Sequence, residues 1–254
     1  MTTDEVEPPA FALARAGDLQ AVEPLIEILR QHPKRATRAT AAHLLEKLGD
    51  ARAIPALEAA LNDTSDGGFF EQDTPVSDLA ADALLAIYHR AGVSANDIQR
   101  LMHVLEQEAD SRDYARLILT QLNAPVEQIL ISHMASLNLR GRAAALIILG
   151  KRRYRPALHL LLESLTDPEP IIRDAAVLAL GALGDTSAFE AVLHCLTDPI
   201  YAVRRSAQFA LAQVSDERHI SALEQVLAKS TLTGFERHDL EKALQAARQR
   251  PTPT

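Results

Sequence analysis

The stretch "TDPEPIIRDAAVLALGALGD" (Thr166–Asp185) aligns without a gap with "TDPIYAVRRSAQFALAQVSD" (Thr197–Asp216), at an offset of 31 residues. The two copies share Asp, Pro, Arg, Ala and Leu at equivalent positions. A repeat of this length is typical of stacked supersecondary units, because one unit alone cannot bury its apolar face. The sequence therefore predicts an array of similar units.

Each copy predicts a helix with a defined start and end. Asp167 can accept hydrogen bonds from free backbone N–H groups, and Pro168 is tolerated at the first helical position. We expect this helix to run to about Leu183. Gly184 can then adopt the left-handed conformation that ends a helix, and Asp185 can cap the next helix. The unit is thus predicted to be two antiparallel helices joined by a tight turn.

The same pattern extends along almost the whole chain, and Ala and Leu dominate it, whereas aromatic residues make up only 4%. This composition favours helices that pack closely through small side chains. We therefore predict an all-α protein of about seven helical pairs. The expected pairs are Asp18–Gly49, Asp50–Ala91, Gly92–Leu122, Asn123–Gly150, Lys151–Gly184, Asp185–Ser215 and Asp216–Gln249.

The pattern D-P-x-x-x-x-R-x-A-A-x-x-A-L-G-x-L-G-D resembles HEAT repeats, and more narrowly the phycobilisome-lyase-like subclass of these repeats. The resemblance implies a right-handed α-α superhelix, a HEAT-like solenoid whose second helices line an inner surface. We expect a single solenoid domain over residues 1–254, with disordered tails at 1–8 and 250–254.

The resemblance also implies that the Asp and Arg of neighbouring units pair as a ladder. We interpret these residues as structural, because a residue that recurs in each unit marks the scaffold. The ladder is expected to be partial. Asp167 with Arg173 and Asp198 with Arg204 carry both members, Arg38 and Arg142 lack the Asp, and Asp78 replaces the Arg.

The first break in the repeat is an acidic insertion, "NDTSDGGFFEQDTPVSD", at residues 62–78. It has five acidic residues and no basic one. Insertions in solenoids form loops on one edge of the stack, often near a binding face. Its adjacent Phe69 and Phe70 are interpreted either as a plug over the core or as an exposed anchor for a partner.

The second break is a basic segment with six positive charges and no negative charge within 16 residues. If the segment includes a helix, its two ends form separate patches rather than one. A functional interpretation is contact with an anionic partner: an acidic protein, phosphate groups or a propionate-bearing tetrapyrrole. The alternative is a solvated surface with Arg142 in the ladder. The residues are Arg140, Arg142, Lys151, Arg152, Arg153 and Arg155.

No catalytic, cofactor-binding or metal-binding residue is predicted. None of the nine His residues is next to a Glu, unlike the repeated His-Glu pairs of the deoxyhypusine hydroxylases, HEAT-like di-iron enzymes. H-E-x-x-H, C-x-x-C and glycine-rich phosphate motifs are also absent from the sequence. The single cysteine, Cys195, is interpreted as a buried apolar residue, with a reactive thiol as the alternative.

Charge and hydropathy limit the partners and the location. A net charge of −8 and the absence of Trp disfavour nucleic acid as a partner and do not fit a HEAT-like DNA glycosylase. The N-terminus has no secretory signal, and no segment reaches the roughly 20 apolar residues of a membrane span. We expect a cytoplasmic protein that does not enter a membrane.

We therefore predict a non-catalytic protein–protein interaction scaffold that presents a curved solenoid surface to a partner protein with an acidic or anionic patch. The anchors are expected among Phe69, Phe70 and the basic segment. The alternative rests on the resemblance alone: a bilin lyase, or a phycobilisome-associated factor that chaperones or degrades the chromophore. Only under that alternative would the chain be an enzyme and bind a bilin.

Overall fold

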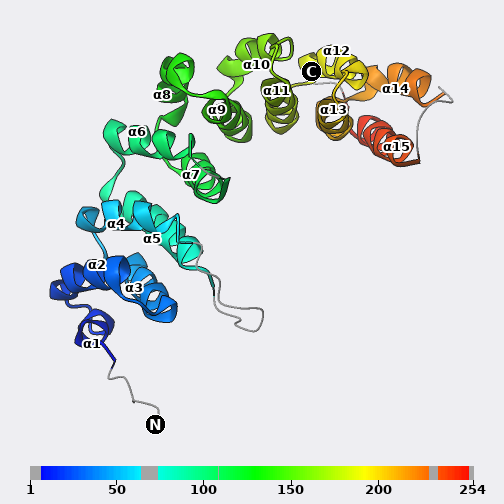
Figure 1. The fold of residues 1–254 in the computed structure, drawn as a ribbon. Coiled ribbons are helices and arrows are strands. Elements are labelled where there is room, and N and C mark those ends of the chain that lie inside the picture. Colours follow the sequence, from blue (N-terminus) through cyan, green and yellow to red (C-terminus); the bar gives the residue numbers. More distant parts are fainter. Residues whose placement is uncertain (1–6, 64–73, 108, 229–233, 252–254) are drawn as a thin grey trace. The chain divides into compact units, whose positions relative to one another are not determined.

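The structure is a computed structural model that describes residues 7–63, 74–107, 109–228 and 234–251. These residues form helices and turns, and no strand is found among them. Within each part of the chain the helices follow one another in pairs (Figure 1). The predicted all-α, HEAT-like fold class is confirmed.

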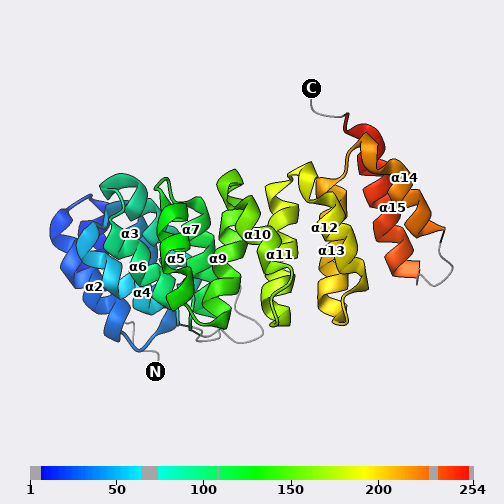
Figure 2. The ribbon, with the colours of Figure 1, turned by 90° about the horizontal axis from the view of Figure 1, so that it is seen from above.

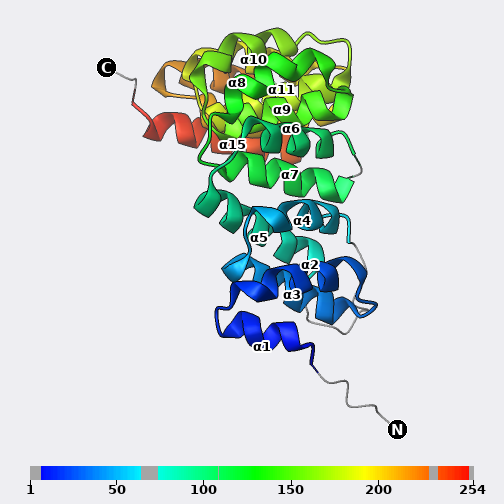
Figure 3. The same cartoon turned by 90° about the vertical axis from the view of Figure 1, so that its left-hand side faces the viewer.

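The chain forms two compact units, residues 1–129 and 130–254, and the boundary falls within one helix. In the N-terminal unit the two helices of each pair pack on each other (α2 on α3, α4 on α5, α6 on α7), and α3 also packs on α5 and α5 on α7 (Figure 3). Its helices are α1 (Pro9–Arg15), α2 (Val22–Gln31), α3 (Arg35–Leu48), α4 (Ile54–Ala60), α5 (Val76–Ala91), α6 (Ala95–Val104), α7 (Ala109–Gln121) and the start of α8 (Val126–His133).

In the C-terminal unit, the second helix of each pair packs on the second helix of the next pair. The contacts run from α9 to α11, from α11 to α13 and from α13 to α15 (Figure 2). After the end of α8, the helices are α9 (Leu139–Lys151), α10 (Leu158–Ser164), α11 (Pro170–Leu183), α12 (Phe189–His194), α13 (Tyr201–Val214), α14 (Ile220–Leu227) and α15 (Gly234–Gln249).

Helices α2 to α15 are seven successive pairs within the ranges predicted from the repeat, whereas α1 was not expected. This short helix begins with a proline, and its Ala10, Phe11 and Ala14 are buried against α2 and α3. With only 7 residues it shows too little periodicity to be recognised in the sequence. It covers the apolar side of the first pair, as a terminal capping element does. The prediction of a single solenoid domain with two tails stays a prediction.

The predicted helix start at the Asp-Pro motif is wrong by two residues. Helix α11 begins at Pro170, with Glu169 as its N-cap, and α13 begins at Tyr201. The Asp167 carboxylate instead accepts a hydrogen bond from the Glu169 amide at 2.8 Å, and Asp198 accepts one from Ile200 at 2.8 Å. The Asp side chain therefore closes a local turn by accepting a hydrogen bond from the amide two residues later. This hydrogen bond competes with capping of the helix.

Glycine allows the second helices of the C-terminal unit to approach closely. A Cβ atom on Gly150 of α9 would lie 2.5 Å from the Cα atom of Ala179 in α11. The equivalent Gly181 of α11 faces Ala210 of α13, where a Cβ would be 2.9 Å from the Ala210 Cβ. Gly184 has φ +71 and ends α11, as the sequence predicted.

Candidate interaction surface

Two ion pairs with the same geometry connect successive helical pairs, one in each unit. Arg173 of α11 donates to both carboxylate oxygens of Asp198, at 2.7 and 3.1 Å. Arg38 of α3 donates to Asp63 at the same two distances. In each case the Asp follows the Arg by 25 residues, and all four side chains are at most 19% exposed. Such two-point pairing fixes the position of one helical pair against the next.

Arginines at this repeat position also form hydrogen bonds to the turn that precedes their helix. Arg173 Nη1 donates to the carbonyl oxygens of Asp167 and Pro168, at 2.9 and 3.1 Å. Arg204 makes the equivalent bonds to Asp198 and Pro199, at 2.7 and 3.0 Å. Each guanidinium thus satisfies two backbone carbonyl groups of the turn.

The Asp63 pairing was missed in the sequence because this residue was assigned to the acidic insertion. Its distance from Arg38, 25 residues, was the available signal, since Asp198 follows Arg173 by the same number. Residues 62–75 of the insertion fall between the end of α4 and the start of α5, and its last three residues belong to α5. Phe69 and Phe70 lie outside the described residues.

Two other ladder positions differ from this arrangement. Among the described residues Arg142 makes no ion pair, although Asp167 follows it by 25 residues. The turn before α9 lacks the Asp-Pro motif, and Asn138 caps the helix, accepting from the Gly141 amide at 2.9 Å. Asp78, which replaces the Arg in α5, accepts a hydrogen bond from the Tyr114 hydroxyl of α7. The Asp78 contact still joins neighbouring pairs, but through a phenol instead of a guanidinium.

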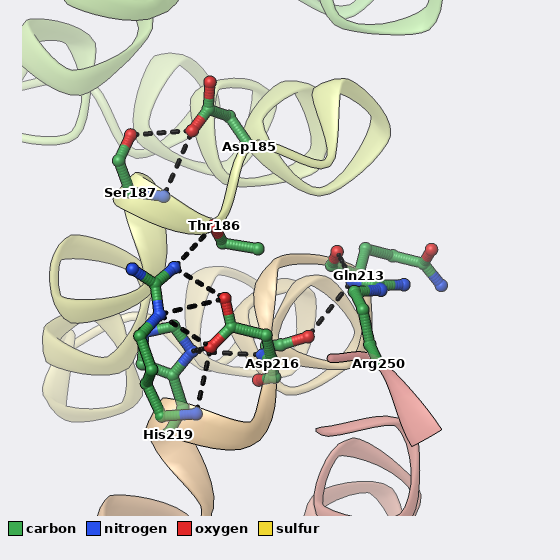
Figure 4. A network of polar contacts seen from close by, with 9 residues as sticks. Asp185, Thr186, Ser187, Gln213, Asp216, His219 and Arg250 are labelled. Atoms are coloured by element: carbon green, nitrogen blue, oxygen red, sulfur yellow. Dashed lines mark hydrogen bonds and ion pairs between the residues drawn. The ribbon is translucent and has the colours of Figure 1, made fainter. Parts of the chain in front are cut away.

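A second polar network joins the turns that follow the second helices (Figure 4). Asp216, which is fully buried, accepts from the Arg218 side chain, and Arg218 also donates to Thr186 Oγ1 at 3.1 Å. The hydrogen bond from Arg218 lowers the pKa of Asp216. Asp185 in the neighbouring turn accepts from the Ser187 amide at 3.1 Å. The network connects two successive turns of the C-terminal unit.

His219 completes this network as a neutral side chain. Burial lowers its pKa, and its Nδ1 accepts the backbone N–H of Asp216 at 3.1 Å. Its ring stacks on Phe189 of α12, with 3.9 Å between ring centroids. The His219 ring therefore packs against α12, and its Nδ1 caps the turn at Asp216.

The predicted basic segment is divided between the two ends of α9. Arg140 and Arg142 lie in its first turn, and Lys151 is its last residue. With a rise of 1.5 Å per residue, Arg142 and Lys151 are roughly 14 Å apart along the helix. The segment therefore forms two patches, the possibility that the sequence had left open.

The patch at the C-terminal end of α9 is the turn formed by residues 151–155, here called the basic turn. Arg153 adopts φ +52, a left-handed conformation that favours glycine. Arg155 donates to Asp185, in the turn after α11, at 2.7 Å. Lys151 and Arg153 are exposed, and neither makes an ion pair within the described residues.

The second helices of the C-terminal unit also carry exposed apolar side chains. Leu178 of α11 is 38% exposed, and Phe209 of α13, at the equivalent position one repeat later, is 47% exposed. Both line a groove of about 350 Å³ that includes Gly181, Ala182 and Ala212, with Asp239 and Lys242 of α15 at its edge. The Arg205 guanidinium lies 5.7 Å from the centroid of the Phe209 ring. This groove was not predicted, because helical periodicity assigns Leu and Phe to the core.

The single cysteine does not form a reactive site. Cys195 is 7% exposed, and burial raises its pKa to about 11. Its thiol donates to the Ala191 carbonyl at 3.3 Å. Within the described part of the chain, His, Cys, Asp and Glu side chains do not gather in threes as metal ligands would. In that same part, each helix is too short or too polar to cross a membrane.

The stacked helix pairs and their ion-pair ladder define an α-solenoid. The family model of HEAT repeats matches residues 10–68, 125–212 and 159–245, which is more than half of the chain. The chain belongs to the HEAT-repeat family.

Among curated proteins, the chain is 36% identical over 155 residues to phycocyanobilin lyase subunit alpha of Picosynechococcus sp. (strain ATCC 27264 / PCC 7002 / PR-6). The match covers 58% of this chain and 56% of that protein, so the chain spans little more than half the length of this relative. The resemblance to the phycobilisome-lyase-like repeat subclass is confirmed.

Two solved structures are similar at lower identity. The complex of CpcE and CpcF of phycocyanin lyase from Nostoc sp. PCC7120 has 20% identity and a TM-score of 0.41, over 89% of this chain and 94% of that one. Human deoxyhypusine hydroxylase in complex with glycerol has 21% identity and a TM-score of 0.38, over 81% and 77%. Since both scores lie below 0.5, no functional conclusion is based on them.

Proposed function

We propose that this chain is a protein-binding scaffold and that its partner docks on the exposed apolar surface of α11, α13 and α15. The observation that carries the proposal is the groove lined by Leu178 and Phe209. The repeat position of Leu178 and Phe209 faces solvent. A large apolar side chain occupies it in two successive helical pairs. The equivalent position in α3 of the N-terminal unit is His43, a polar residue that is 47% exposed.

The energetics of this surface favour a protein partner. Phe209 is a large anchor that keeps nearly half of its surface in water, and burying an aromatic side chain at an interface stabilises a complex by about 2 kcal/mol. Small residues on α11 and α13 leave room beside it, and Asp239 and Lys242 supply a polar rim. An apolar centre with a polar rim is the usual composition of a protein interface.

The relative in the family supports a protein partner rather than a small substrate. It is named as the alpha subunit of a lyase, and a subunit acts together with another chain. The partner expected here is therefore a protein segment, such as a helix, that presents apolar side chains to the groove. Catalysis is not needed for this role.

The test is capture of the partner by the full chain, by Leu178→Glu and by Phe209→Glu, followed by measurement of the affinity for the captured protein. Each carboxylate placed in the groove should weaken binding at least tenfold, because it would be buried without a partner. His43→Glu, the equivalent change in α3, should leave binding unchanged. Equal binding by all variants at equal melting temperature would overturn the proposal.

A second candidate function is that of a bilin lyase subunit, and the 36% identity to phycocyanobilin lyase subunit alpha favours it. Under this alternative the chain would act on the pigment named in that relative, and the basic residues would face its acidic groups. The measurement is the absorbance spectrum of phycocyanobilin mixed with the full chain. An unchanged spectrum at saturating protein would exclude this candidate and leave the scaffold proposal intact.

A further inference from the structure

The basic turn departs from the scaffold at each position where the scaffold has a structural residue. An offset of 31 aligns it with the turn after α11. There, Leu183 ends the helix, Gly184 adopts the left-handed conformation and the Asp185 side chain caps the next helix. The corresponding residues of the basic turn are Arg152, Arg153 and Tyr154.

These replacements weaken the turn locally. A non-glycine residue in the left-handed region costs about 1 kcal/mol, and Arg153 has φ +52. Tyr154 makes no side-chain capping bond, and the loss of an Asp cap costs about 1 kcal/mol. The left-handed Arg153 does not improve packing, since its side chain is exposed. Strain that packing does not require is often associated with a functional surface.

The same replacements leave an unbalanced positive charge. Three other turns that follow a second helix have Asp at the capping position: Asp50, Asp185 and Asp216. At residue 154 the acid is absent, so the turn has four cations and no anion of its own. Asp185 compensates Arg155, at 2.7 Å, whereas Lys151 and Arg153 make no ion pair within the described residues. These two exposed cations give this edge of the C-terminal unit a positive charge.

We propose that the basic turn binds an acidic peptide segment, a short run of Glu or Asp, in the partner protein. This inference rests on the proposed function, in which the partner is a protein, and assigns the chemistry of a second contact outside the groove. A long nucleic acid is disfavoured, because the chain as a whole has a net charge of −8. A polyanion gains affinity from phosphates that cations neutralise, and the turn supplies only four cations.

The test uses a fluorescently labelled oligo-glutamate peptide, with an oligo-glutamine peptide as reference, in anisotropy titrations of the full chain at low salt. The informative variant is Lys151→Gln with Arg153→Gly, since glycine suits φ +52 and folding is preserved. We expect about tenfold weaker binding, equivalent to about 1.4 kcal/mol, and a melting temperature that does not fall. Arg140→Gln with Arg142→Gln, the same charge change at the other end of α9, should have little effect.

Three results would overturn the inference: no saturable binding of oligo-glutamate, an equal loss with the Arg140 and Arg142 variant, or tighter binding of a single-stranded oligonucleotide than of the peptide. The groove variant Phe209→Glu separates this inference from the proposed function. It should leave peptide binding unchanged even though it abolishes capture of the partner protein. If capture survives and peptide binding fails, only the basic turn has been misassigned.

Discussion

The two units are built from the same kind of helix pair, but they differ in charge and in the side chains they expose. Residues 1–129 have 11 basic and 21 acidic residues, whereas residues 130–254 have 15 and 13. The net charges are therefore −10 and +2. The solvent-facing position held by Leu178 and Phe209 in the C-terminal unit is occupied by His43 in the N-terminal unit.

The residues inside the stack are more alike than the residues outside it. Arg38 binds Asp63 with the same two distances as Arg173 binds Asp198. The ladder therefore has the same geometry in both units, whereas the exposed residues differ between them. Five predictions test this comparison, from the largest expected effect to the smallest.

The close approach of second helices in the C-terminal unit depends on Gly150. Gly150→Ala should lower the free energy of unfolding by about 2 kcal/mol, because its Cβ would lie 2.3 Å from the Ala179 carbonyl oxygen. The position of Gly150 and Gly181 corresponds to Glu46 in α3. Glu46→Ala is thus the matched control and should change stability by about 0.5 kcal/mol or less. Urea unfolding measures both, and equal effects would mean that the units pack alike.

The two ladder ion pairs, Arg38–Asp63 and Arg173–Asp198, should stabilise the fold by similar amounts. Arg38→Ala and Arg173→Ala should each cost about 2 kcal/mol, since each leaves a partly buried carboxylate and two carbonyl groups without their donor. Arg204→Ala should cost about 1 kcal/mol, because its bonds in the described part of the chain go to two carbonyl groups. Thermal unfolding of the three variants checks this order. A large difference between Arg38 and Arg173 would contradict a common scaffold.

Acid should remove the benefit of the Arg173–Asp198 pair. The hydrogen bond from Arg173 lowers the pKa of Asp198 below its ordinary value of 3.8. The pair therefore stabilises the fold fully above that value, and the contribution is lost as the pH falls through the lowered pKa. The difference in melting temperature between the native chain and Arg173→Ala should narrow below about pH 4.

The pKa of Glu58, in the N-terminal unit, is shifted in the direction opposite to that of Asp198. Burial raises its pKa, although Arg100 and Tyr88 oppose the shift. Its ionisation therefore favours the unfolded chain, and its unfavourable contribution diminishes as the pH falls through the raised pKa. Glu58→Gln should leave the acid-dependent effect of Arg173 unchanged. If it abolished that effect, the two units would not be independent in this respect.

The smallest effect concerns Cys195, the only cysteine in the chain. Its buried thiol, with a pKa of about 11, should react slowly with a maleimide near neutral pH and rapidly in urea. Because it lies in the C-terminal unit, its labelling reports the opening of that unit alone. Comparing the urea midpoint of labelling with that of far-UV circular dichroism shows whether the units unfold together. Rapid labelling of the native chain would contradict the buried position.

The sequence predicted the fold well because repetition sets the positions of many residues at once. The helix pairs, the left-handed Gly184 and the capping role of Asp185 all follow from local rules of helix ends. The start of α11 was wrong by two residues, since Asp167 can satisfy a turn as readily as a helix. Helix α1 was missed because so short an element depends on burial against α2 and α3.

The candidate surface was less predictable than the fold. The basic residues were visible in the sequence, but their separation by α9 follows from the helix that joins them. Leu178 and Phe209 looked like core residues, and only their exposure identifies them as candidate contacts. Asp63 looked like part of an acidic loop, yet it belongs to the ladder.

The sequence by itself determined the helix pairs, their order and the family, because periodicity, capping and small side chains act over a few residues. Tertiary structure decided which of several similar apolar residues remain in solvent and which charges are neutralised. Arg155 is bound to Asp185, which follows it by 30 residues, whereas Lys151 and Arg153 extend into water. Such differences depend on contacts between successive helical pairs, which a local pattern does not encode.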